Sequence, residues 1–257
     1  MLLAKDGARV VAFDARGHGA TICENEALDP LLLVADLVAI VAAVRRDVDQ
    51  EIVLIGHSMG ASIVVSAANS IPNVVAAGVI DVVEGTAIES LSHMHSVLRN
   101  RPAKFRSTDD AIKWSLRSHL LQNKESAKIS VPHLLKRLAG EPPVFTWRTD
   151  LAASEPYWKS WFEGLSSRFL AMKCARLLVL AGADRLDKEL TIGQMQGKFQ
   201  VVVYPESWHY VQEDVPDKLA ETLTEFWTRN QKLVTIKRFP IPIKPAAATV
   251  GATAPQE

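Results

Sequence analysis

The run Gly56-His57-Ser58-Met59-Gly60 constrains the fold of this chain more than any other feature, because it fits the pattern G-x-S-x-G. An apolar run at residues 51–55, typical of a buried strand, leads directly into it, and small apolar residues at 61–69 predict a helix after it. A serine between a strand and a helix lies on a strained turn that exposes its hydroxyl at the carboxyl edge of a sheet. Side chains at Gly56 and Gly60 are expected to collide with the neighbouring strand and helix. We therefore interpret Ser58 as a nucleophile rather than as part of a chance glycine turn.

The rest of the chain predicts an α/β fold with a mostly parallel sheet and helices on both faces. Further continuous apolar runs predict strands at residues 9–13, 76–83, 176–181 and 199–204. Helical signals lie between and after these runs, at residues 29–46 and 216–229.

The composition divides this α/β chain into a core, an insertion and a tail. We expect residues 1–86 and 172–231 to form the core, residues 87–171 a mostly helical lid, and residues 232–257 a disordered tail rich in proline and alanine. The prolines at 142 and 143 are expected to break the helical pattern of the insertion. Four of the six tryptophans fall in the insertion, and we expect these rings to be buried more often than exposed: Trp114, Trp147, Trp158 and Trp161.

Composition and charge exclude several classes of protein. The 257 residues carry 29 basic and 29 acidic side chains, so no net positive field would gather phosphates, and nucleic acid is not an expected partner. The most apolar stretch, residues 31–44, contains Asp36 and is shorter than the roughly 20 residues that span a bilayer, so no membrane partner is expected. Cys23 and Cys174 lie far apart, without the spacing of a metal site or a disulfide framework, which predicts a reducing compartment, the cytoplasm.

A serine hydroxyl needs a base at neutral pH, and histidine suits this role because its pKa lies near the working pH. His209 is the candidate among seven histidines, because it follows the last predicted strand and precedes the final helix. His57 is expected to point away from the serine, and His18 to fix the loop after the first strand. The other four are expected to be surface or core residues of the insertion: His93, His95, His119 and His133.

The third group of such a triad is a carboxylate that orients the imidazole. Asp81 ends the strand after the nucleophile helix, whereas Asp184 and Asp187 follow the next strand. All three keep the chain order serine, acid, histidine, and the spacing slightly favours the second loop. Glu84 is a weaker fourth candidate. The residue pattern by itself leaves the acid open.

Longer runs give a narrower resemblance. They are LIGHSMG at 54–60 with IDVVEGTA at 80–87, LAGADRLDK at 180–188 with TIGQMQGKFQ at 191–200, and VQEDVPDK at 211–218 after His209. Over about residues 9–229 the chain resembles the protein phosphatase methylesterase family. The resemblance implies an α/β-hydrolase fold with a helical lid. It also implies that the acid is Asp81, in the IDVVEG run, which reverses the preference from spacing.

The resemblance further implies a reaction: hydrolysis of the methyl ester on the C-terminal leucine of the type 2A serine/threonine phosphatase catalytic subunit. Ser58 would attack the ester carbonyl, His209 would take its proton, and Asp81 would hold the histidine. The backbone N–H of Met59 would be one oxyanion donor, and no cofactor or metal is implied. Two alternatives stay open, namely a generic small-molecule esterase and a non-catalytic phosphatase-binding protein.

The N-terminus departs from the family pattern, which has strands, a helix and a glycine-rich oxyanion loop before the run RVVAF at residues 9–13. Because Met1 lies just upstream of that run, we expect N-terminal strands to be missing, one of them between RVVAF and the strand before Ser58. Losing one oxyanion donor costs about 10²–10³ in rate, so we expect a weakly active and poorly stable chain. Trp208, where the family usually has glycine, is expected to narrow the site. The tail carries dispersed charges that are more typical of solubility than of a nuclear address: Lys232, Lys237, Arg238 and Lys244.

Overall fold

The computed structural model describes residues 3–182 and 186–237, and its central element is a four-stranded parallel sheet in the order β1-β2-β5-β6. The strands are β1 (Ile52–His57), β2 (Val74–Ile80), β5 (Ala175–Ala181) and β6 (Gln200–Tyr204). The strands predicted at these four places are confirmed to within a few residues. Since the strands are parallel, their carboxyl ends meet at one edge, which is where the predicted site residues follow them.

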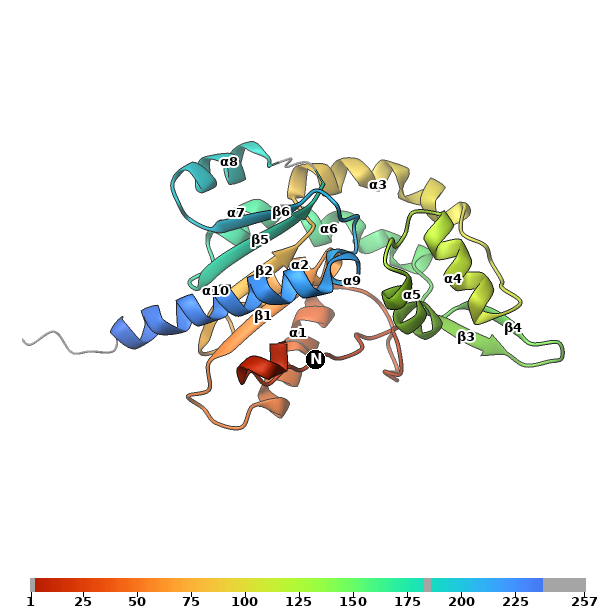
Figure 1. Ribbon diagram of the computed structural model, residues 1–257, viewed down its shortest axis with the longest axis horizontal. Coiled ribbons are helices and arrows are strands. Elements are labelled where there is room, and N and C mark those ends of the chain that lie inside the picture. Colours follow the sequence, from red (N-terminus) through yellow and green to blue (C-terminus); the bar gives the residue numbers. More distant parts are fainter. Residues whose placement is uncertain (1–2, 183–185, 238–257) are drawn as a thin grey trace, which may run out of the picture.

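Helices cover both faces of the sheet, as the continuous apolar strands predict (Figure 1). One face packs against α1 (Pro30–Val44), α2 (Met59–Ala67), α6 (Trp158–Phe162), α7 (Leu165–Leu170) and α8 (Lys188–Met195). The other packs against α9 (Val211–Asp214) and α10 (Pro216–Lys237). Residues of β5 alternate between the two layers: Leu177 belongs to the cluster under α10 and Leu178 to the opposite cluster.

The start of helix α1 shows why residues 29 and 30 were sufficient to predict where this helix begins. Asp29 precedes the helix and its Oδ1 accepts a hydrogen bond from the Leu31 N–H at 2.7 Å, while Pro30 occupies the first helical position. The predicted helix at residues 29–46 is therefore confirmed, ending at Val44.

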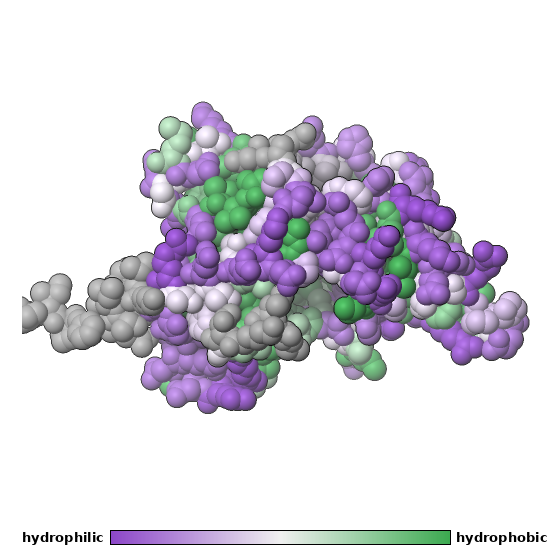
Figure 2. Space-filling model, viewed as in Figure 1, coloured by the Kyte–Doolittle hydropathy of each residue, from purple (hydrophilic) through white to green (hydrophobic). Residues whose placement is uncertain are grey.

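The insertion leaves the sheet after β2 and has a hydrophobic cluster of its own, centred on buried Phe105 and Leu135. It consists of α3 (Glu84–Arg99), α4 (Thr108–Arg117), α5 (Lys124–Ser130), β3 (Leu135–Leu138) and β4 (Val144–Trp147). The prediction of a mostly helical insertion missed the antiparallel β3–β4 hairpin. Residues 142 and 143, the two prolines expected to break a helix, lie in the connection between these strands. Figure 2 shows a largely hydrophilic surface over this part of the molecule.

The last part of the predicted lid packs with the core rather than with the insertion. Trp158 and Trp161 are each 6% exposed and belong to the same cluster as α1 and α2, which confirms their predicted burial. Trp114 and Trp147 are half-buried and pack edge to face in the insertion's cluster. The start of α3 at Glu84 also precedes the expected boundary at residue 87.

Two predicted elements differ in the structure. Residues 9–13 form no strand. Val11 and Phe13 line a cavity of about 590 Å³ together with the end of β1, and in the described part of the chain no strand pairing joins this segment to β1. Helix α10 continues to Lys237, past the predicted end at residue 229 and into the region expected to be a disordered tail. The rest of that predicted tail, residues 238–257, lies outside the described residues. Among the described helices none has the length and apolar character needed to cross a membrane.

Candidate active site

Ser58 lies on the tight turn between β1 and α2, in the strained conformation that the motif predicts. Its φ is +52°, in the left-handed region that a residue with a side chain rarely adopts, and its N–H donates to the Ile80 carbonyl at 3.0 Å. Gly56 permits this turn, since a Cβ there would lie 2.3 Å from the Gly60 carbonyl oxygen. The turn therefore requires glycine at position 56, as expected.

The expectation of the same collision at Gly60 is wrong. A Cβ at this position would meet no atom within 4 Å outside its own helix, because Gly60 borders the open cavity beside β1. Its contribution is the backbone against which Gly56 packs.

His209 and Asp81 form a hydrogen-bonded pair at the carboxyl ends of the strands. His209 Nδ1 lies 2.7 Å from Asp81 Oδ2, and since a carboxylate accepts only, Nδ1 carries the proton and Nε2 is the nitrogen able to take another. Asp81 Oδ1 accepts from the Ala181 N–H at 2.8 Å. With φ at +51°, Asp81 turns out of β2, and its two oxygens bridge β5 and the histidine.

Ser58, Asp81 and His209 all line one cavity of about 460 Å³. Its remaining walls are mostly apolar and come from the end of β2, α3 and α6, among them Val82, Val83, Leu91, Met94 and Phe162. The three predicted triad residues, which lie far apart in sequence, thus face a common space suited to an apolar group. Met59, the predicted oxyanion donor, is the first residue of α2, so its N–H has no acceptor within the helix.

The other candidate acids are held elsewhere. Asp187 accepts from the Leu190 N–H at 2.9 Å and from the Ser166 hydroxyl at 2.5 Å, so it caps α8. Glu84 accepts from the N–H groups of Gly164 and Ser166 at the start of α7, at 2.8 and 3.0 Å. Asp184 lies outside the described residues.

His57 has a role that the sequence did not reveal. Its Nε2 donates to the backbone carbonyl of His209 at 2.7 Å, and the two ring centroids are 4.5 Å apart. Burial, reinforced by the nearby His209, lowers the pKa of His57 from 6.5 to about 4, so the ring is neutral at physiological pH. The elbow residue before the nucleophile therefore supports the backbone of the candidate base. Only its adjacency to Ser58 could have suggested this.

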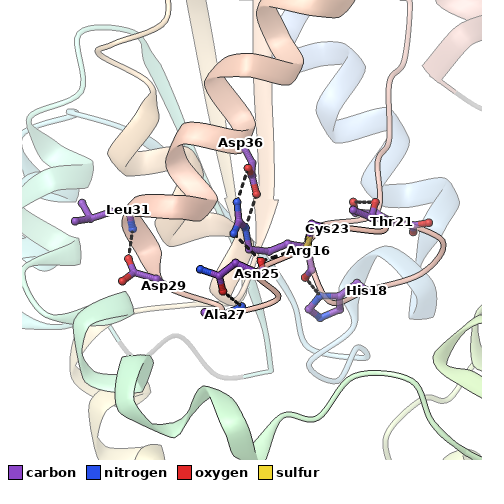
Figure 3. A network of polar contacts seen from close by, with 10 residues as sticks. Arg16, His18, Thr21, Cys23, Asn25, Ala27, Asp29, Leu31 and Asp36 are labelled. Carbon is purple, nitrogen blue, oxygen red and sulfur yellow. Dashed lines mark hydrogen bonds and ion pairs between the residues drawn. The ribbon is translucent and has the colours of Figure 1, made fainter.

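The loop after residue 13 contains His18 and is held by its own polar network (Figure 3). Arg16 binds both carboxylate oxygens of Asp36 in α1, at 2.6 and 2.7 Å, and donates to the Asn25 carbonyl at 2.9 Å. His18 Nδ1 lies 2.9 Å from the Arg16 carbonyl. His18 therefore helps to hold this loop, as predicted, and its ring does not line the cavity with Ser58.

The four histidines of the insertion also lie outside that cavity. His95 pairs with Glu155 at 3.1 Å, and His119 packs against the ring of Trp208 at 4.7 Å. His93 and His133 are exposed. The Trp208 ring thus packs against the insertion and is absent from the lining of the catalytic cavity, contrary to the expectation that it narrows the site.

The insertion also holds the segment that carries His209. Asp214 accepts from the backbone N–H of Gln122 at 2.8 Å and from that of Trp208 at 2.9 Å. One carboxylate thus joins the loop before α5 to the residue preceding the candidate base. A second link lies nearby, since the Ser130 hydroxyl donates to Glu213. Within the described residues, no group of three or more His, Cys, Asp or Glu side chains is arranged to hold a metal ion.

Comparisons with known sequences match residues 2–222 to a family model described as the alpha/beta hydrolase family. A curated relative from Yarrowia lipolytica, protein phosphatase methylesterase 1, is 46% identical over 230 residues, which is 87% of this chain and 54% of the relative. The relative of the same name from Schizosaccharomyces pombe is 48% identical, over 87% of this chain and 67% of its own length. The mouse relative of that name is 40% identical, with 87% and 69% covered. The chain thus spans between about half and two thirds of these relatives.

Solved structures agree on the fold. E-2-(acetamidomethylene)succinate hydrolase superimposes with a TM-score of 0.71 at 20% identity, over 84% of this chain and 80% of that one. An esterase of M. tuberculosis superimposes with a TM-score of 0.65, also at 20% identity, over 88% and 79%.

Proposed function

The chain belongs to the protein phosphatase methylesterase family of alpha/beta hydrolases, and from that premise we propose that it is a serine carboxylesterase acting on a methylated phosphatase. The substrate we propose is the methyl ester on the C-terminal leucine of the type 2A serine/threonine phosphatase catalytic subunit. The observation that carries the proposal is the 2.7 Å contact between His209 Nδ1 and Asp81 Oδ2 in the cavity that Ser58 also lines.

The first half of the proposed reaction forms an acyl-enzyme. Ser58 Oγ attacks the ester carbonyl carbon while His209 Nε2 takes the hydroxyl proton, and Asp81 stabilises the resulting imidazolium. The Met59 N–H, at the first position of α2, donates to the oxyanion of the tetrahedral intermediate in this proposal. The intermediate collapses when His209 passes its proton to the methoxy oxygen, so methanol leaves and the acyl group stays on Ser58.

The second half uses water. His209 Nε2 takes a proton from a water molecule that attacks the acyl carbon, and then returns a proton to Ser58 Oγ as the acyl–serine bond breaks. The products are a free carboxylate and the regenerated serine, so no redox partner or cofactor enters the balance. The apolar walls contributed by Leu91, Met94 and Phe162 suit a leucine side chain next to the ester.

A fluorophosphonate probe tests the proposed nucleophile, because it labels only an activated serine. We expect the purified chain to be labelled and to release methanol from the methylated phosphatase. Ser58→Ala should abolish both signals, while Ser62→Ala, a nearby helix serine, should retain them.

The two rival functions give different outcomes in the same experiment. A generic small-molecule esterase would be labelled and would hydrolyse a p-nitrophenyl ester, but it would not hydrolyse the methyl ester of the phosphatase. Binding of the phosphatase without labelling would identify a non-catalytic binding protein. Either result would contradict the proposal.

We also propose a cytoplasmic location, supported by the two unpaired thiols of Cys23 and Cys174.

A further inference from the structure

A further cavity, of about 650 Å³, is lined by the last turn of α3, by the β3–β4 hairpin and by the residues that follow each of them. We call it the basic groove, because its walls include Arg99, Arg101, Lys136 and Arg148. Asp150 is the one carboxylate among its lining residues, and it accepts hydrogen bonds from the backbone N–H groups of Ala152 and Ala153.

The four cations of the basic groove are not neutralised within the described part of the chain. None of them has a carboxylate within ion-pair distance, although ion pairs are common elsewhere on the surface. Arg148 donates only to backbone carbonyls, those of His133 and Leu135. In a chain whose net charge is zero, such a concentration of positive charge fits an anionic partner.

Arg101 strengthens this interpretation because it is withdrawn from water. Its guanidinium carbon lies 3.8 Å from the centroid of the Trp147 ring, a cation–π contact. Burial lowers the pKa of Arg101, which means that its charged form is destabilised where it sits. A carboxylate bound beside it would replace the lost hydration and make a bidentate contact.

Helix α3 connects the basic groove to the catalytic cavity. Ala87 and Met94 line the cavity that contains Ser58, and Leu98, one turn after Met94, lines the basic groove. At 1.5 Å per residue, Leu98 is about 6 Å along the helix from Met94 and about 17 Å from Ala87. An extended peptide covers that span with about two to five residues.

The insertion also reaches the candidate base through Tyr210. Its ring centroid is 5.4 Å from that of His209, and burial raises the pKa of its hydroxyl while the charge of Arg101 opposes that rise. Tyr210 also packs against the hydrophobic cluster of the insertion, so this ring joins the insertion to the candidate base.

We propose that the basic groove binds an acidic segment of the protein substrate, about two to five residues before the esterified leucine. This inference rests on the proposed function, because it assumes that the peptide end enters the cavity of Ser58. A peptide fits better than a nucleic acid, since the chain as a whole has no net positive charge to attract a phosphate backbone.

The test uses two fluorescein-labelled peptides of about eight residues that end in leucine methyl ester. One carries two glutamates within the predicted span, and the other carries glutamines there. Binding is measured by fluorescence anisotropy with Ser58→Ala, which leaves the ester intact. We expect the Ser58→Ala variant to bind the glutamate peptide about tenfold more tightly than the glutamine peptide. This preference should shrink as the salt concentration is raised to about 0.5 M.

Charge reversal locates the binding surface. The double variant Arg99→Glu/Lys136→Glu, made at two exposed positions of the groove, should lose the preference for glutamate. The matched control, Arg46→Glu/Lys173→Glu, makes the same change in net charge at exposed positions before β1 and β5, at the opposite end of the strands. It should keep the preference.

Equal binding of the two peptides would overturn the inference, and so would an equal loss in both double variants. Stronger binding of an oligothymidylate to the same groove would also overturn it, in favour of a nucleic acid. Fluorophosphonate labelling separates this result from the proposed function. A labelled serine with no glutamate preference rejects only the groove, whereas a preference without labelling rejects only the esterase.

Discussion

Asp81 and Asp187 are the same residue type near the carboxyl ends of neighbouring strands, yet their partners differ. Asp81 holds the ring of His209, whereas Asp187 accepts from the first turn of α8 and from Ser166. Sequence spacing could not separate them, because the distinction depends on the left-handed turn at Asp81 that swings its side chain toward the histidine.

Replacing each aspartate by asparagine should separate catalysis from stability. Asp81→Asn should lower kcat by on the order of 10³–10⁴ with little change in KM, because the imidazolium loses its counter-charge and the wrong tautomer is favoured. Asp187→Asn should keep kcat within a few fold and lower stability by up to about 1 kcal/mol through the weakened cap. Steady-state kinetics and urea unfolding measure the two effects. Comparable losses of kcat in both variants would contradict the assignment of the acid.

His57 should affect the reaction through the backbone of His209. His57→Phe removes the donor to the His209 carbonyl, a bond worth about 1 kcal/mol, and should lower kcat about five- to tenfold without raising KM. His57→Gln retains an N–H donor and should recover most of the rate. His93→Gln, at an exposed position, is the control and should match wild type. A change confined to KM would argue against a positioning role.

His57 also predicts a pH dependence of stability. Its folded-state pKa, about 4, is below its ordinary value of 6.5, so between these values the unfolded chain binds more protons than the folded one. The contribution is fully present above pH 6.5 and is lost as the pH falls toward 4. Urea midpoints of wild type and His57→Gln should therefore diverge less at about pH 5 than at about pH 7, as the wild type loses its advantage. A constant difference would contradict the shifted pKa.

At the scale of elements, most of the core could be predicted from local sequence. The strands before Ser58 and Asp81 have continuous apolar runs, and α1 begins at an aspartate and a proline. Residues 9–13 carry an equally good strand pattern but form none, because a strand requires a neighbour and β1 lies across a cavity. The β3–β4 hairpin was missed because its strands are only four residues long and helical spacing surrounds them.

The order of the catalytic elements along the chain could be predicted from the sequence. The contacts that hold the loop of His209 to the insertion could not. The contact between Asp214, Gln122 and Trp208 joins residues far apart in sequence, and no local pattern indicates it.

Asp214→Ala should leave two backbone N–H groups without their acceptor and destabilise the protein by about 1–3 kcal/mol. It should also lower kcat, because the loop before His209 is no longer held. Asp217→Ala, an exposed neighbour in α10, is the control for both measurements, and equal effects would contradict this role.

At the scale of the whole molecule, β1 stands at an edge of the sheet, and along that edge no strand of residues 3–182 and 186–237 pairs with it. Ile55 is 38% exposed there, and Val11 and Phe13 are each 45% exposed across the cavity. An uncovered apolar edge is a template for pairing with another chain. The protein should therefore self-associate at high concentration, in a manner that depends on β1.

A charge placed on that edge should prevent the association. We expect Ile55→Lys to shift the sedimentation distribution toward monomer, because pairing would bury the new ammonium. Val48→Lys adds the same charge at a residue that is 77% exposed and lies before β1, so it should behave as wild type. Association that survives Ile55→Lys would show that another surface is responsible.

The bridge from the insertion to the loop of His209 has a pharmacological consequence. A small molecule wedged between Gln122 and Asp214 would displace the imidazole without competing for the space around Ser58. Such an inhibitor would lower the maximal velocity toward peptide and synthetic esters alike, and no excess of either would reverse it. Its binding site would include the loop before α5, so its selectivity would depend on residues of the insertion.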